Sequence, residues 1–163
     1  MGFDGEIFDA KKFKQFINKH VSEIINQAIC YSMKSHENIK VFAVLENIEH
    51  IRKYWQNNID PDTVLVPFDC GSTNRPDCLQ GRAAHWGLIV GSQLSDKCGS
   101  QGKLEEKLVV LKHSKTKLDQ IVTVESIIKS NLQLDESDSD VNVFGGSGLK
   151  GRCIKLFIKI VNS

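Results

Sequence analysis

The sequence has 163 residues and a net charge of +1, with 40% hydrophobic and 25% charged residues. This composition is that of a single ordinary globular domain spanning residues 1–163, and the near-neutral charge gives no support to a nucleic-acid or membrane-surface role. No apolar run approaches the roughly 18 residues that span a bilayer. The N-terminus lacks the pattern of a signal peptide, and five scattered cysteines are predicted to be reduced thiols in the cytoplasm.

The N-terminal region predicts one amphipathic helix from about Asp9 to about Ile29, with Asp9 as its N-cap. Its apolar residues recur at steps of three, one and four, which places them on a single stripe. The stripe comprises Phe13, Phe16, Ile17, Val21, Ile24, Ile25, Ala28 and Ile29. The predicted role of this helix is packing.

Two strands and a second helix follow. Residues 39–45 form a compact apolar strand, and residues 46–57 predict a helix. The buried face of that helix is expected to comprise Ile48, Ile51, Tyr54 and Trp55. Residues 63–68 predict the next strand, and Pro67 indicates that this strand lies at an edge or carries a bulge.

The stretch from Arg82 to Gly91 predicts a buried strand that begins near His85. Residues 88–90 are apolar and partly β-branched, and Gly91 is expected to end the strand. An imidazole at the start of such a strand stands at the edge of the core, where a rigid scaffold can hold it as a base. The alternative is a half-buried histidine that hydrogen-bonds to backbone.

Two loops flank this strand, at residues 69–81 and 92–103. Loops of this length in a compact domain often shape a cleft, although a plain surface loop is an equal alternative.

The last third of the chain predicts a hairpin, one helical turn at residues 125–131 and a final strand. The hairpin joins residues 108–111 to 120–124, and an acidic loop is expected at 135–140. The final strand, residues 152–161, alternates and is expected to turn an aliphatic face inward, namely Ile154, Leu156, Ile158 and Ile160. The order of elements indicates an α+β fold with N-terminal helices and a mostly antiparallel sheet.

Metal and phosphate sites are weakly supported. Cys70, Cys78, His85 and Cys98 have long, uneven spacings without a Cys-x-x-Cys pair, so no metal site is predicted. The glycine-rich segment 145–151 precedes a strand rather than a helix, which favours a turn over a phosphate loop. We therefore expect no cofactor, and none of the five cysteines has the sequence surroundings of an activated nucleophile.

Four blocks in order carry a resemblance to a known family: residues 3–8, 64–69, Ala84-His85-Trp86 and the Ser-Asn-Leu-Gln-Leu block at 130–134. Together they resemble the actin maturation proteases, which have a papain-like cysteine-protease fold related to bacteriocin-processing peptidases. The similarity runs over about residues 5–161.

The resemblance implies a cytosolic cysteine aminopeptidase whose peptide substrate is the N-terminus of immature actin. Such an enzyme removes an N-acetylated methionine or cysteine and exposes the acidic residue behind it. His85 matches the catalytic histidine of the family, which acts as the general base. No nucleic acid or membrane partner is implied, and the oligomeric state is left open.

Two departures from the family pattern matter. The nucleophile of the family is a cysteine in a Cys-Gly-Leu block upstream of the segment that matches residues 5–8, and this sequence holds no counterpart of it. In the related peptidases an aspartate orients the imidazole, but Thr123 stands at the aligned position. Glu125, Asn131 and Asp119 are the alternatives for that role.

The sequence therefore predicts a partial, N-terminally truncated papain-like domain without the nucleophile helix. The alternative is a catalytically inactive short form that serves as an actin-binding or regulatory module. Without a nucleophile, the rate falls by about a million-fold, so we expect no hydrolysis by a cysteine mechanism from these 163 residues.

Overall fold

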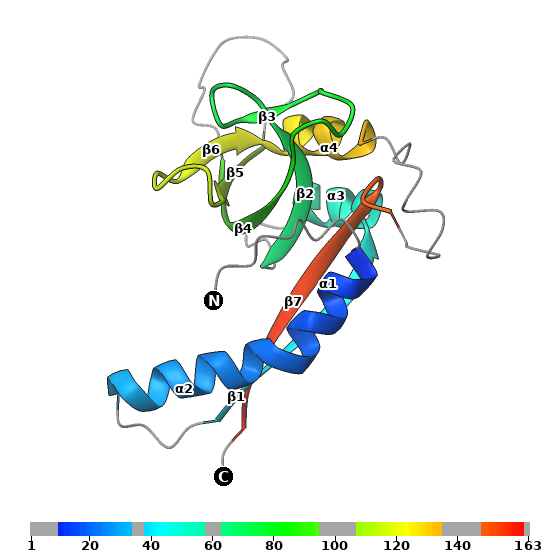
Figure 1. Ribbon diagram of the computed structural model, residues 1–163. Coiled ribbons are helices and arrows are strands. Elements are labelled where there is room, and N and C mark those ends of the chain that lie inside the picture. The colour runs from blue at the N-terminus through cyan, green and yellow to red at the C-terminus, as the bar shows by residue number, and fades with distance from the viewer. Residues whose placement is uncertain (1–9, 34–37, 58–62, 95–106, 135–147, 162–163) are drawn as a thin grey trace.

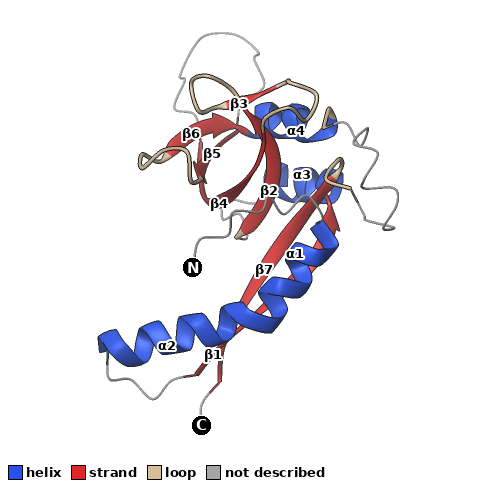
Figure 2. Ribbon diagram, viewed as in Figure 1, coloured by secondary structure: helices blue, strands red, loops and turns tan. Residues whose placement is uncertain are grey.

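The computed structural model describes residues 10–33, 38–57, 63–94, 107–134 and 148–161. The strands in these ranges form one seven-stranded antiparallel sheet in the order β1-β7-β2-β4-β5-β6, with β3 paired to β2 (Figures 1 and 2). Their bounds are β1 Asn38–Asn47, β2 Val64–Cys70, β3 Pro76–Asp77, β4 Ala84–Leu94, β5 Lys107–Lys112, β6 Gln120–Thr123 and β7 Arg152–Val161.

The helices described by the structure are α1 Ala10–Phe16, the π-helical turn η1 Ile17–Val21, α2 Ser22–Met33, α3 Ile48–Asn57 and α4 Val124–Leu132. This content confirms the predicted α+β class, with helices at the N-terminus and a mostly antiparallel sheet. The predicted hairpin is also confirmed, because β5 pairs with β6. The helix predicted at residues 125–131 is longer than one turn. No helix among the described residues is long and apolar enough to cross a membrane.

The long N-terminal helix contains a π turn that the sequence did not predict. Phe13, Ile17, Val21 and Ile25 pack against the sheet, as expected, and they are spaced four residues apart. An α-helix would rotate such a stripe away from the sheet, and the wider π turn keeps it in place. Ile24 is exposed, so the expectation that it is buried is wrong. Asp9 lies outside the described residues.

The same helix covers the outer edge of β1 with polar side chains. Asn18, Ser22 and Asn26, also four residues apart, each donate to and accept from the backbone of one β1 residue. Their partners are Ala43, Val41 and Ile39, at donor–acceptor distances of 2.6 to 3.4 Å. These bonds satisfy backbone groups that an edge strand otherwise leaves open to pairing with another chain.

The strand that contains His85 is longer than predicted. Gly91 does not end it, because β4 continues to Leu94 after a bulge between Ile89 and Gly91. Residues 92–94 are therefore strand, which corrects their assignment to a loop, and residues 95–103 lie outside the described part of the chain. The bulge absorbs one residue and lets the pairing with β5 continue.

Pro67 lies in β2, a central strand, but in a part of β2 that pairs with β4 and not with β7. β2 pairs with β7 only at Val64 and Leu65, whereas it pairs with β4 along its whole length up to Asp69. Pro67 cannot donate a backbone hydrogen bond, and on this stretch none is needed toward β7.

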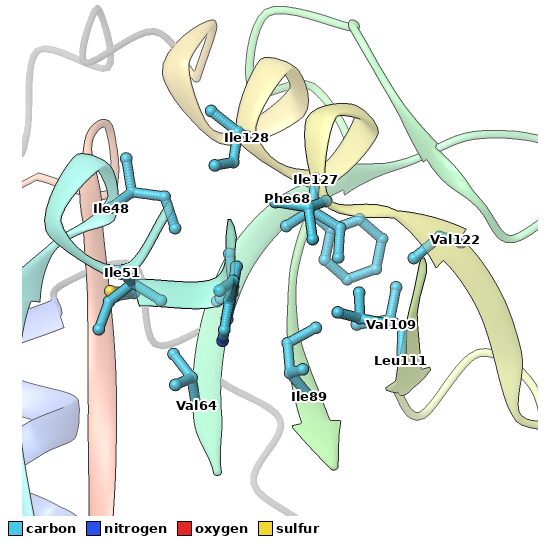
Figure 3. Packing of buried hydrophobic residues seen from close by; sticks show 14 residues of the cluster. Ile48, Ile51, Val64, Phe68, Ile89, Val109, Leu111, Val122, Ile127 and Ile128 are labelled. Atoms are coloured by element: carbon cyan, nitrogen blue, oxygen red, sulfur yellow. The ribbon is translucent and has the colours of Figure 1, made fainter. Parts of the chain in front are cut away.

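The main core lies between the sheet and helices α3 and α4 (Figure 3). It contains Ile48, Ile51 and Trp55 from α3, as predicted, while the Tyr54 side chain is outside the described part. The remaining members come from β2, β4, β5, β6, α4 and β7: Val64, Val66, Phe68, Ile89, Val109, Leu111, Val122, Val124, Ile127, Ile128 and Cys153.

A second, smaller core lies on the other face of the sheet, beneath the N-terminal helix. It is formed by Ile17, Val41, Ala43 and Ile154, with Trp86 and Phe13 in an edge-to-face contact 4.9 Å apart at its margin. Ile158 and Ile160 are exposed, so the expectation of an inward aliphatic face on β7 is wrong at its C-terminal end. There β1 and β7 continue as a two-stranded ribbon away from the main core (Figure 1).

Candidate functional site

His85 is the second residue of β4 and lies directly opposite Phe68 of β2. Residues opposite each other in antiparallel strands share a face of the sheet, so His85 is on the face that carries the main core. It is half-buried. The prediction of an imidazole at the start of a core strand is therefore confirmed in its geometry.

Gly87, two residues further on, lets the neighbouring strands pack against this part of β4. A Cβ atom there would lie 2.5 Å from Leu111 Cδ1 and 2.8 Å from Phe68 Cε1, both below any normal contact. The His-Trp-Gly order thus has a physical reason: His85 and Gly87 face the main core, while Trp86 packs on the opposite face.

Asp69 organises the loop at residues 71–83, just before His85. Its carboxylate is fully buried. It accepts four hydrogen bonds: from the backbone N–H groups of Leu79 (3.0 Å), Gly81 (2.8 Å) and Ala83 (3.1 Å), and from Gln133 Nε2 (2.7 Å). A buried carboxylate is tolerated only when it is satisfied in this way.

These bonds fix the backbone that leads into the candidate base. Ala83 donates its N–H to Asp69 and accepts a hydrogen bond from the Cys70 N–H (2.9 Å), two residues before His85. The start of β4 is therefore held from both sides, which is the preorganisation that a catalytic group needs.

The block at residues 130–134 clamps the same region from α4. Ser130 Oγ accepts from the Asp69 N–H (2.9 Å), and Gln133 bonds to both the Asp69 carboxylate and the Gln80 N–H. Asn131, which is buried, donates to the carbonyls of Pro67, Leu149 and Arg152 and accepts from the Gly151 N–H, at 2.9 to 3.5 Å. The polar members of this block thus join α4 to β2 and to the start of β7.

The three candidates for orienting the imidazole all have other partners. Asn131 uses its amide as described above. Glu125 pairs with Arg52 through contacts of 2.7 and 2.8 Å, and hydrogen bonding to Glu125 raises the pKa of Arg52. Asp119 is half-exposed and lies 3.3 Å from Lys112 Nζ. Thr123, at the aligned position, caps α4 by accepting from the Ser126 N–H.

The described cysteine side chains differ in their capacity to form a thiolate. Burial, together with the charge of Glu46, raises the pKa of the Cys153 thiol to about 12. Burial also raises the pKa of Cys70, and the charge of Lys115 offsets only part of that rise. Cys78 is exposed. The side chain of Cys30 and all of Cys98 lie outside the described part of the chain. Among the described residues, no His, Cys, Asp and Glu side chains cluster as a metal site would require.

Sequence reasoning missed Asp69 and His113 as members of this region. His113 packs edge-on against Phe68 with ring centroids 5.4 Å apart, and its Nε2 lies 2.9 Å from the Asn74 carbonyl oxygen. That contact places the proton on Nε2, and the buried Nδ1 has no partner in the described structure. For Asp69, an available signal was an acidic residue at the end of an apolar strand that leads into a glycine-containing loop.

A model of one protein family, described as actin maturation protease-like, C-terminal domain, matches residues 1–93. The match covers more than half of the 163 residues and includes Asp69, the loop at 71–83 and His85, whereas the block at 130–134 lies beyond it. No curated protein and no solved structure matches the sequence.

Proposed function

This chain belongs to the actin maturation protease-like family, and we propose that it supplies the histidine part of a cysteine peptidase for the N-terminus of immature actin. The proposed reaction removes an N-acetylated methionine or cysteine. The observation that carries the proposal is the position of His85, inside the matched region and at the rigid start of a core strand. The substrate implies that the peptidase works in the cytoplasm.

The proposed mechanism is acyl transfer. His85 takes the proton of a cysteine thiol, and the thiolate attacks the carbonyl carbon of the N-acetylated residue. His85 then gives the proton to the departing amine of the next residue, leaving an N-acetylaminoacyl thioester. Water hydrolyses the thioester, with His85 again accepting a proton, and regenerates the thiol.

The nucleophile of this reaction is not one of the described cysteine side chains. Raised pKa values keep Cys70 and Cys153 protonated at neutral pH, and Cys78 lies on the exposed loop without a helix N-terminus to stabilise a thiolate. We assign the role to a Cys-Gly-Leu block such as the family carries. In its absence the catalytic unit lacks a member whose loss costs about a million-fold in rate.

The group that orients His85 is proposed from the same three candidates: Glu125, Asn131 and Asp119. Two of them are carboxylates in ion pairs at least partly open to solvent, and the third is a buried amide with four backbone partners. NMR titration of His85 in three variants tests them. Losing an orienting carboxylate in Glu125→Gln or Asp119→Asn lowers the pKa of the imidazole, whereas gaining one in Asn131→Asp raises it.

A second candidate function is that of an actin-binding or regulatory module without catalysis. The observation that favours it is the exposed apolar surface on the ribbon of β1 and β7, because surfaces of this kind mark interaction sites.

The experiment is complementation with a cleavage assay. The 163-residue chain is mixed with, or fused to, a family segment that contains the Cys-Gly-Leu block, and an acetyl-Met-Asp peptide is followed by mass spectrometry. We expect cleavage only when both parts are present, and its loss in His85→Ala. If the chain alone cleaves the peptide, and one Cys→Ala substitution abolishes this, the assignment of the nucleophile is wrong.

A further inference from the structure

The ribbon of β1 and β7 has one face without cover in the described structure. Its residues, which we call the outer ribbon face, are Lys40, Phe42 and Val44 on β1 and Lys155, Phe157 and Lys159 on β7. Phe42 lies opposite Phe157, Val44 opposite Lys155 and Lys40 opposite Lys159. Phe42 is 47%, Phe157 43% and Val44 41% exposed. The N-terminal helix packs on the opposite face of these strands (Figure 2).

The edge of the ribbon is already occupied. Asn18, Ser22 and Asn26 take the outward backbone groups of β1 at alternate residues. An added strand would have to displace this set of hydrogen bonds, so a partner of the ribbon uses its face and not its edge.

The charges on the outer ribbon face indicate whether its partner is acidic or basic. Three lysines surround the apolar residues, whereas the next residue of β1 on this face, Glu46, is the one acidic residue of the two strands and lies 3.9 Å from His50. A second copy packed face to face would bring six ammonium groups together, which opposes self-association. A partner with carboxylates on both sides of an apolar stripe meets the face with complementary charge.

The geometry favours a peptide over a nucleic acid. Lys155 Nζ lies 5.0 Å from the centroid of the Phe157 ring, where it covers part of the surface that a base would stack on. The six residues span about 13 Å along the strands, which is about two and a half turns of an α-helix. On the other face, the N-terminal helix packs against β1 and against Ile154 and Leu156 of β7, so a helix is a fitting shape for strands of this ribbon.

We propose that the outer ribbon face binds an acidic amphipathic helix of a partner protein. Apolar side chains of that helix cover Phe42, Val44 and Phe157, and its carboxylates pair with Lys40 and Lys159. The proposal rests on the ribbon alone and does not depend on His85 or on peptidase activity.

The test is fluorescence anisotropy with the full 163-residue chain and a labelled 14-residue helical probe that carries a leucine stripe flanked by glutamates. We expect saturable binding that weakens at least tenfold in Phe42→Ser, and at least tenfold between 50 and 500 mM NaCl. Lys159→Glu should weaken binding of the acidic probe and restore binding to a probe with two glutamates changed to lysine. Circular dichroism verifies that each variant is folded.

Leu118→Ser is the matched control, because Leu118 is 76% exposed on the turn between β5 and β6, away from the ribbon. It should leave the affinity unchanged. Equal binding by Phe42→Ser and the unmodified chain would overturn the proposal. So would a dimer in sedimentation that Phe42→Ser dissociates, or stronger binding of a single-stranded oligonucleotide or phosphatidylserine vesicles than of the acidic probe.

Discussion

Replacing Asp69 with asparagine should destabilise the protein by about 3 kcal/mol. The asparagine oxygen can take the position of Oδ2, which accepts from Leu79, Gly81 and Gln133. Those three bonds then lose their ionic character, at about 0.5 kcal/mol each. The amide NH₂ takes the position of Oδ1 and faces the Ala83 N–H, so one buried donor loses its acceptor at about 1 to 2 kcal/mol.

Urea denaturation followed by circular dichroism measures the change in the free energy of unfolding, and hydrogen exchange locates it. The amides of Leu79, Gly81 and Ala83 should exchange faster in Asp69→Asn, while those of the core strands keep their order of protection. Asp119→Asn is the control, because its half-exposed pair with Lys112 is worth less than about 1 kcal/mol. The reasoning would be refuted if the free energy of unfolding of Asp69→Asn lay within about 0.5 kcal/mol of that of the unmodified chain, which is about the scatter of such measurements.

Three further substitutions test the packing, the edge cover and the buried thiol. Gly87→Ala should lower the free energy of unfolding, measured by urea denaturation, by about 1 to 3 kcal/mol, because the new methyl group would lie 2.5 Å from a side-chain carbon of β5. The Cβ of the control Gly91→Ala meets nothing closer than 3.9 Å and should cost less. Equal costs for the two variants would contradict this. Asn26→Ala removes two hydrogen bonds to β1 and should lower the free energy of unfolding by about 1 to 2 kcal/mol. The control Gln27→Ala changes an exposed side chain and should have little effect. Equal stability of the two variants would contradict the stabilising role of the helix at the edge of β1. Burial raises the pKa of Cys153 from 9.0 to about 12, so the folded state holds the thiol proton more tightly and stability falls as pH rises above 9.0. The unmodified chain should then lose about 1.4 kcal/mol more than Cys153→Ala for each pH unit in that window, and parallel pH profiles would contradict the assignment.

The fold was predictable where a pattern repeats along the chain. The apolar stripe of the first helix, the buried face of α3 and the alternation of β7 identified their elements because the periods of helix and strand are fixed by backbone geometry. The alternation failed at Ile158 and Ile160, since it identifies the two faces of a strand but not which strand of a face the helix covers. Val41 of β1 is buried, whereas Ile158 opposite it is exposed.

The position of His85 in the fold was predictable from the sequence, and the role of Asp69 in the loop was not. His85 stands beside an apolar run, which is a local signal, whereas the partners of Asp69 are backbone amides 10 to 14 residues away whose positions depend on the folded loop. The helix carried one signal that was available from spacing alone. Asn18, Ser22 and Asn26 follow each other at four-residue steps beside the apolar stripe, and short polar side chains of this kind can satisfy the open backbone groups of a strand edge.

The measurement that tests the central claim most directly is cleavage of the acetyl-Met-Asp peptide by the chain joined to a family Cys-Gly-Leu segment, with and without His85→Ala. If His85 is the base of an actin-maturation-type peptidase, the joined protein releases acetylmethionine, and His85→Ala reduces the rate at least a hundredfold, the lower end of what a general base contributes, about 10² to 10⁴. Equal rates for the two proteins, both folded by circular dichroism, would contradict the account.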